Sequence, residues 1–243
     1  VHRGEGSETI LNLNENDINL YFNAEASKGN EGSHYDLLWP INKLKNQGEC
    51  PSRLGPLLRL DTMSEPMNFK GPCYDDEPVA VGGSKSLNRN DFIYGEVEGD
   101  GACYFHSVAW ILTMEGPNQV KKNETLKQTE NRRNKLAKKL RRDCVNWLEK
   151  NLDFIIPQLG RTIRDEIQDE VDSELRSENN KKYRTINQYL GYMMKPKSWA
   201  GQIEIYGLSH ELGRSIRVFI EKDGKYKSSG LGYMLGSNPD IMD

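Results

Sequence analysis

Alternation of apolar and polar residues predicts strands near both ends of the chain and just before its middle. Residues 9–22 alternate twice around a polar turn at 14–17, which predicts two short strands. A segment of strand character at 92–97 precedes a long apolar run. Residues 215–220 form a further strand, and Asp223-Gly224 directly after it is typical of a hairpin turn.

Apolar residues recur three and four positions apart in the second half of the chain, which predicts helices. The predicted helices cover 123–153, 161–178 and 183–194. A further helix follows Trp199 and ends at Gly213, which stands where a glycine cap is expected. The chain therefore has strands and helices mixed along its length.

Two of the predicted helices carry charge blocks of opposite sign. The helix at 123–153 has a basic outer face from Lys121 through Arg142, and the helix at 161–178 has an acidic face from Asp165 to Glu178. Blocks of this kind are typical of solvated faces, which can pair with each other. The functional alternatives are nucleic-acid contact for the basic face and docking of a basic protein for the acidic face.

Residues 40–91 differ from the rest of the chain in composition. Six of the chain's ten prolines fall here together with Gly82-Gly83, and the segment has little periodicity. This composition predicts a long, loop-rich connector that wraps the surface. We therefore expect one domain over 1–243, with its core formed by 1–39 and 92–243.

Charge and cysteine content narrow the classes of function. The net charge of −3 gives no general attraction to nucleic acid or anionic membranes. No apolar stretch approaches the length of a membrane span, and residues 1–30 lack a signal-peptide pattern. The four cysteines are widely spaced, which argues against a zinc site or a disulfide framework and favours a reducing compartment. Cys144 lies on the apolar side of its helix and is predicted to be core.

The segment 99–108 carries the strongest chemical signal. Glycines flank Asp100, Cys103 follows two residues after Gly101, and an apolar run then predicts a buried helix. Cys103 would lie at the first turn of this helix, where unpaired N–H groups and the helix dipole favour a thiolate. Loop N–H groups beside it could receive a developing oxyanion. The alternative is that Cys103 is one more buried structural thiol.

These residues resemble the signature of the ovarian-tumour (OTU) family of cysteine proteases, Asp-Gly-x-Cys followed by an aromatic or apolar pair. His106 stands where the family usually has arginine. A second family segment follows in the same order, with Trp199-Ala200-Gly201 in place of Trp-Gly-Gly and an Ile-Arg-Val strand at 216–218. The resemblance implies an α/β, papain-like domain with a small mixed sheet packed between helices.

The family's catalytic histidine lies in a His-aromatic-acid segment, which His34-Tyr35-Asp36 matches. His2 lies near the end of the chain, His106 is badly aimed from the nucleophile's own helix, and His210 has the pattern of a surface residue. In an extended segment, side chains two apart point to the same side, so Asp36 could orient the ring of His34. This segment usually follows the Ile-Arg-Val strand but here precedes the cysteine, which predicts a circular permutation similar to bacterial effector OTU domains.

The resemblance implies a deubiquitinase that hydrolyses isopeptide bonds at the C-terminal glycine of ubiquitin. Cys103 would be the nucleophile and His34 the base, with Asp36 or Asp100 as the third residue; Asp100 could instead hold the loop's shape. The implied oxyanion and substrate-channel residues are Gly101, Ala102, Gly32, Ser33, Trp199 and Gly201.

No metal or organic cofactor is implied by the resemblance. Ubiquitin and polyubiquitin chains are the expected partners, without nucleic acid or membrane. The expected location is the host cytoplasm, after secretion from a bacterium. Two other functions remain open: a ubiquitin-binding module without catalysis, which the departures at His106 and Ala200 would suit, and another thiol hydrolase or acyltransferase with His210 as its base.

Overall fold

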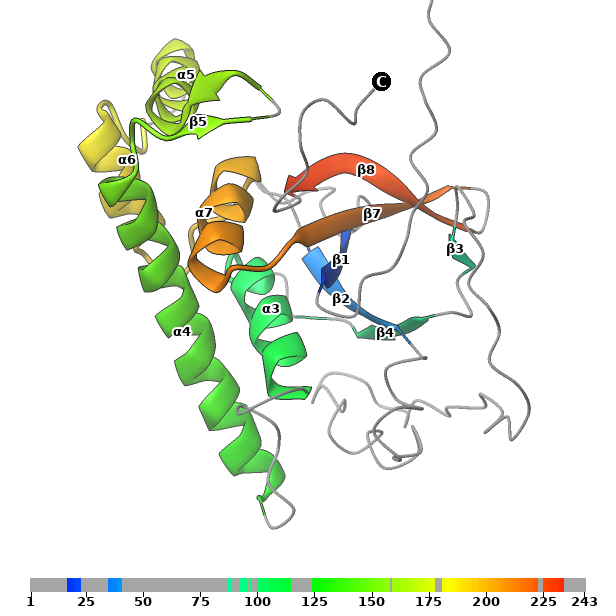
Figure 1. Ribbon diagram of the computed structural model, residues 1–243. Helices are drawn as coiled ribbons and strands as arrows, with labels where there is room; N and C mark the ends of the chain where they lie inside the picture. The colour runs from blue at the N-terminus through cyan, green and yellow to red at the C-terminus, as the bar shows by residue number, and fades with distance from the viewer. Residues whose placement is uncertain are drawn as a thin grey trace, which may run out of the picture.

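A mixed β-sheet with helices on one of its faces makes up the fold (Figure 1). The computed structural model describes residues 17–22, 35–40, 87–88, 92–95, 97, 100–114, 124–157, 159–177, 181–222 and 225–233. Within these ranges, none of the helices is long and apolar enough to cross a membrane.

The sheet has six strands in the order β3-β8-β7-β1-β2-β4. They are β1 (Ile18–Phe22), β2 (Tyr35–Pro40), β3 (Leu87–Asn88), β4 (Phe92–Gly95), β7 (Ile216–Lys222) and β8 (Lys225–Tyr233). β1 is parallel to β7, with Ile18 opposite Ile216, and every other neighbouring pair is antiparallel. The two N-terminal strands therefore lie inside the sheet, and β1 pairs with a strand from much later in the chain.

The helices form two layers over the sheet. They are α3 (Cys103–Met114), α4 (Leu126–Lys150), α5 (Ile163–Arg176), α6 (Ile186–Met193) and α7 (Gln202–Leu212). Figure 1 shows α3 and α7 between the sheet and the long helix α4, which contacts both of them. A two-stranded hairpin of β5 (Ile155–Ile156) and β6 (Arg161–Thr162) lies with α5 and α6 at the C-terminal end of α4.

The core fills the space between the sheet and α3, α4 and α7. Alternate residues of the central strands point into it, among them Ile18, Leu20, Tyr35, Leu37, Ile216 and Val218. α4 and α7 approach each other closely at Gly207, where a Cβ atom would lie 2.8 Å from the Leu148 side chain. Cys144 is fully buried beside them, which confirms its prediction as a core residue.

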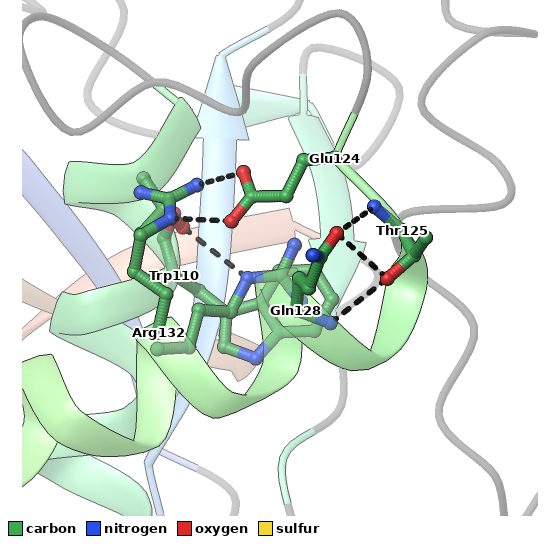
Figure 2. Close-up of polar contacts among 7 residues, drawn as sticks. Trp110, Glu124, Thr125, Gln128 and Arg132 are labelled. Carbon is green, nitrogen blue, oxygen red and sulfur yellow. Dashed lines mark hydrogen bonds and ion pairs between the residues drawn. The ribbon is translucent and has the colours of Figure 1, made fainter.

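The start of α4 is fixed by contacts between its first two turns and the residues directly before it (Figure 2). Thr125 and Gln128 form a capping box, in which the Thr125 hydroxyl accepts from the Gln128 N–H and the Gln128 side chain accepts from the Thr125 N–H. Arg132 donates from two nitrogens to both carboxylate oxygens of Glu124, each at 2.9 Å. These contacts fix where the chain enters the helix.

Arg133, the next residue of α4, attaches this end of the helix to α3. Its guanidinium carbon lies 3.3 Å from the centroid of the Trp110 ring, and its Nε donates to Thr113 Oγ1 at 3.3 Å. Burial lowers the pKa of Arg133 to about 10. Arg133 is therefore part of the packing between α3 and α4.

Most of the sequence-based elements are confirmed. The helices predicted at 123–153, 161–178 and 183–194 appear as α4, α5 and α6. Gly213 adopts the left-handed conformation with φ 62 at the C-cap of α7, as its position predicted. The predicted strand at 215–220 appears as β7, and Lys222 pairs with Lys225 across the expected hairpin. Part of the first strand prediction, residues 9–16, lies outside the described residues.

The sequence analysis missed the shortest strands and misjudged part of the basic face. β3 lies within the predicted connector and pairs with β8, so the connector's end belongs to the sheet. The hairpin of β5 and β6 was not predicted either. Arg133 and Arg141 belong to the basic block that was expected to face solvent, yet both are buried.

Candidate active site

Cys103 is the first residue of α3, as the glycines before it predicted. The Ala102 carbonyl accepts the first helical hydrogen bond, from the His106 N–H at 3.0 Å. Cys103 therefore lies at the N-terminus of α3, where the N–H groups of the first turn have no partner within the helix and the helix dipole is positive. Cys103 is 1% exposed, so its side chain is buried at the start of α3.

The loop before Cys103 is held by Asp100 and shaped by Gly101. Asp100 Oδ1 accepts a hydrogen bond from the Ala102 N–H at 2.9 Å. This contact supports the expectation that Asp100 can hold the loop's shape. It also engages the Ala102 N–H in this structure, so the predicted role of that amide as an oxyanion donor requires it to exchange its partner.

Gly101 occupies a position that only glycine fits. Its φ is +85, and a Cβ atom there would lie 2.2 Å from the carbonyl oxygen of Lys197. Gly101 therefore packs directly against the backbone that leads to Trp199. This contact joins the two segments that resemble the family, although they are far apart in the sequence.

The start of β2 lies against the first turns of α3. The Tyr35 ring stands edge-on to the Tyr104 ring with centroids 5.6 Å apart, and the Ser107 hydroxyl donates to the Tyr35 carbonyl at 2.9 Å. Asp36 is fully buried, and its Oδ1 accepts from the Val97 N–H at 2.9 Å. This hydrogen bond attaches Asp36 to Val97, which lies in the segment that leads into the cysteine loop. His34, with Gly32 and Ser33, lies outside the described residues.

His210 lies in an aromatic stack, and this corrects its prediction as a surface residue. Its ring is parallel to that of Trp147 at a centroid distance of 4.7 Å and edge-on to Phe154 at 4.6 Å. Burial lowers the pKa of His210. His210 is six residues beyond Glu204, the residue of α7 whose carbonyl meets Tyr104, so the helix rise places it about 9 Å further along the axis.

The turn at 199–201 is anchored at Gly201. Gly201 donates its N–H to Glu204 Oε2 at 2.8 Å, and Glu204 Oε1 accepts from the Tyr189 hydroxyl at 2.7 Å. Glu204 is buried, and this burial raises its pKa. Ala200, which replaces the family's glycine, is buried, while Trp199 is half-buried. The role of Trp199 and Gly201 as channel walls stays a prediction.

Arg141 is a residue of this site that the sequence analysis missed. Its guanidinium donates to the carbonyl of Gly101 in the cysteine loop and to carbonyls of the segment before Trp199. A signal for it exists in the sequence, because Arg141 lies four residues from Ala137 on the apolar stripe of its helix. Charged side chains are rarely buried without a partner, so an arginine on this apolar stripe indicates a specific structural role.

Comparison with protein-family models gives one match that bears on this site. The model described as "OTU-like cysteine protease" matches residues 98–239, which is more than half of the chain and includes Cys103 but not His34. Searches of curated proteins and of solved structures find no match. Among the described residues, no group of three or more His, Cys, Asp or Glu side chains is placed to hold a metal ion.

The family match confirms the expected α/β, papain-like fold and thiol protease chemistry. The circular permutation, the bacterial origin and the location in a host cell stay predictions. With its glycine-flanked loop, its cysteine at the start of α3 and a match over 98–239, the chain belongs to the family of OTU-like cysteine proteases.

Proposed function

We propose that this cysteine protease is a deubiquitinase, with Cys103 as its nucleophile, His34 as its general base and Asp36 as the residue that orients His34. The substrate class comes from the family resemblance. The site assignment depends on one observation, the contact between the start of β2 and α3. Tyr35 packs on Tyr104, the residue directly after Cys103.

His34 directly precedes Tyr35 in the sequence, and its adjacency to a residue that contacts the nucleophile's neighbour supports its assignment as the base. The sheet register supports the same assignment. β4 pairs with β2 with Leu37 opposite Gly95, so the chain leaves β4 beside the start of β2 and then enters the cysteine loop.

The strand order supports the circular permutation that this assignment needs. β1 and β2 precede the span matched by the family model, yet β1 pairs in parallel with β7, which lies inside that span. Catalytic triads are defined by geometry and not by chain order. A histidine segment at the N-terminal side can therefore serve a nucleophile that follows it.

The proposed reaction has an acylation stage and a deacylation stage, and each stage includes two proton transfers through His34. His34 takes the Cys103 thiol proton, and the thiolate attacks the carbonyl carbon of ubiquitin's C-terminal glycine. The imidazolium then donates the proton to the leaving lysine amine. Water, deprotonated by His34, hydrolyses the resulting thioester and regenerates the thiol. Backbone N–H groups of the cysteine loop stabilise the oxyanion.

The test is hydrolysis of a fluorogenic amide at the ubiquitin C-terminus. Cys103→Ala should abolish turnover because covalent catalysis is lost, and an electrophilic ubiquitin probe should no longer form an adduct. His34→Ala should lower kcat by about a hundredfold to ten-thousandfold, the usual contribution of a general base. Asp36→Asn, which keeps an oxygen for the Val97 N–H, should cost less than His34→Ala.

A matched variant separates this assignment from the conventional chain order. His210→Phe retains an aromatic ring between Trp147 and Phe154 and should keep full activity. An active His34→Ala beside an inactive His210→Phe would transfer the base to His210. A folded wild-type protein that binds ubiquitin but forms no adduct would instead identify a binding module.

A further inference from the structure

Arg141 has an unusual environment for a charged side chain. It is 5% exposed, and its two terminal nitrogens donate to carbonyls that are distant in the chain. Nη1 donates to Met193 at 3.0 Å and to Ser198 at 2.9 Å, and Nη2 donates to Gly101 and to Pro196, both at 3.0 Å. A single side chain thus connects the cysteine loop to the segment that leads to Trp199.

We infer that Arg141 is a positioning residue for catalysis, which holds the peptide group between Gly101 and Ala102 in the orientation that the Cys103 loop needs. The inference rests on the proposed role of Cys103 as the nucleophile. It is independent of the identity of the protein that Cys103 attacks.

The peptide group in question is held from both sides. Its carbonyl, from Gly101, accepts from Arg141, while its N–H, from Ala102, donates to Asp100 at 2.9 Å. Because a peptide group is planar and trans, fixing its oxygen also fixes the direction of its N–H. The cation and the carboxylate therefore hold one peptide plane, which ends at the Cα atom of Ala102, the residue directly before the nucleophile.

Such a restraint is needed because the loop contains glycine. Gly101 has φ +85, and glycine reaches both signs of φ at little cost, so its adjoining peptide groups rotate more easily than those of other residues. Rotation of the peptide between Gly101 and Ala102 would redirect the N–H groups at the start of α3. The contacts with Arg141 and Asp100 oppose this rotation.

Arginine suits this task better than lysine. The guanidinium carries five N–H donors in a rigid plane, which matches several carbonyls at once, whereas a lysine ammonium is compact. The plane of Arg141 is also supported by Phe105, whose ring centroid lies 4.5 Å from the guanidinium carbon. Burial lowers the pKa of Arg141, while Glu204, Cys144, Asp100 and Cys103 oppose this effect in that order.

The test compares Arg141→Lys with Arg142→Lys, the exposed neighbour on the same helix. Two rates are measured: alkylation of Cys103 by iodoacetamide across pH, which needs no ubiquitin, and hydrolysis of the fluorogenic ubiquitin amide. In a folded Arg141→Lys protein we expect kcat to fall by about tenfold to a hundredfold, less than for loss of a direct oxyanion donor, with KM within about twofold. The pH profile of alkylation should also shift. Arg142→Lys should change none of these quantities.

A double-mutant cycle distinguishes positioning from general packing. Asp100→Ala releases the other side of the same peptide group, so its loss of kcat and that of Arg141→Lys should be clearly non-additive. Should Arg141→Lys fail to fold, Arg141→Gln, which retains two donors, takes its place in the cycle. Additive losses, or a folded variant with unchanged kcat and alkylation profile, would overturn the inference. If wild-type protein cleaves no ubiquitin amide, the proposed substrate fails, and the alkylation arm still decides the role of Arg141.

Discussion

Two buried arginines of α4 contact the two ends of α3 in different ways. Arg133 lies over Trp110 near the end of α3, and Arg141 reaches the loop at the start of α3. Both are almost fully buried, and burial lowers the pKa of each. Arg133 contacts a ring and a hydroxyl, both parts of regular helix. Arg141 contacts backbone carbonyls of irregular segments.

The difference indicates what each end of the interface does. A helix satisfies its own backbone, so at the Arg133 end the cation adds packing on Trp110 and a side-chain hydrogen bond to Thr113. Irregular segments need partners for their buried carbonyls, and Arg141 supplies them. We therefore expect changes at the Arg133 end to affect stability, and changes at the Arg141 end to affect catalysis.

The largest effect is expected at the loop itself. Gly101→Ala introduces a Cβ atom that would lie 2.2 Å from the Lys197 carbonyl oxygen, so the backbone must move beside Cys103. We expect activity to fall by at least about a hundredfold, as for the loss of an oxyanion donor. Gly160→Ala is a matched control, because it also has positive φ but has no atom within 4 Å of its Cβ position.

Gly160→Ala should cost only the strain of a left-handed alanine, about 1–2 kcal/mol of unfolding free energy, and leave kcat unchanged. Denaturant unfolding and the fluorogenic assay measure the two quantities. If Gly101→Ala were as active as Gly160→Ala, the cysteine loop would tolerate displacement. The start of α3 would then be no more important for catalysis than its end.

A smaller effect, on stability alone, is expected at the other end. Arg133→Met removes the contact with Trp110 and the hydrogen bond to Thr113, which together contribute about 1–3 kcal/mol. The unfolding midpoint should fall while kcat and KM stay unchanged, and the exposed Lys135→Met should alter neither. A loss of kcat in folded Arg133→Met would mean that α3 transmits strain from its end to its start.

The smallest effect concerns pH and the His210 stack. Burial lowers the pKa of His210, whereas an unfolded histidine takes up its proton near pH 6.5. Its contribution to stability is therefore present above about pH 6.5 and is lost as pH falls below that value towards the folded pKa. His210→Phe should lose less stability than the wild type between pH 7.5 and 5.5 in denaturant unfolding. If the wild type and His210→Phe had the same pH dependence of stability, the lowered pKa of His210 would be contradicted.

Long, periodic elements were predictable from sequence, because apolar spacing reports which face is buried. The helices after Cys103 and the strand β7 are of this kind. β3, β5 and β6 have two residues each, too few for any period to show. Arg133 and Arg141 were missed for a different reason: a run of lysines and arginines was treated as one face, although these two share the stripe of Ala137 and Leu148.

The candidate site was predictable where backbone geometry fixes the side chain. The glycines before Cys103 correctly predicted its position at a helix start, and one of the two roles left open for Asp100, support of the loop, agrees with its hydrogen bond to the Ala102 N–H. The surroundings of His210 depend on Trp147 and Phe154, which are distant in sequence, so its pattern alone was misleading. The contact of Tyr35 with Tyr104 likewise depends on strand pairing that no local pattern contains.

The position of β1 has a consequence for how the protein is made. β1 is synthesised early, yet its parallel neighbour β7 belongs to the last part of the chain, with Ile18 opposite Ile216. Until β7 emerges from the ribosome, the inner edge of β1 has no strand to pair with, and such edges invite association with other chains. Contacts this distant in sequence also slow folding. Nascent chains should therefore stay vulnerable to misassembly until β7 has been synthesised, because the middle of the sheet cannot close before then.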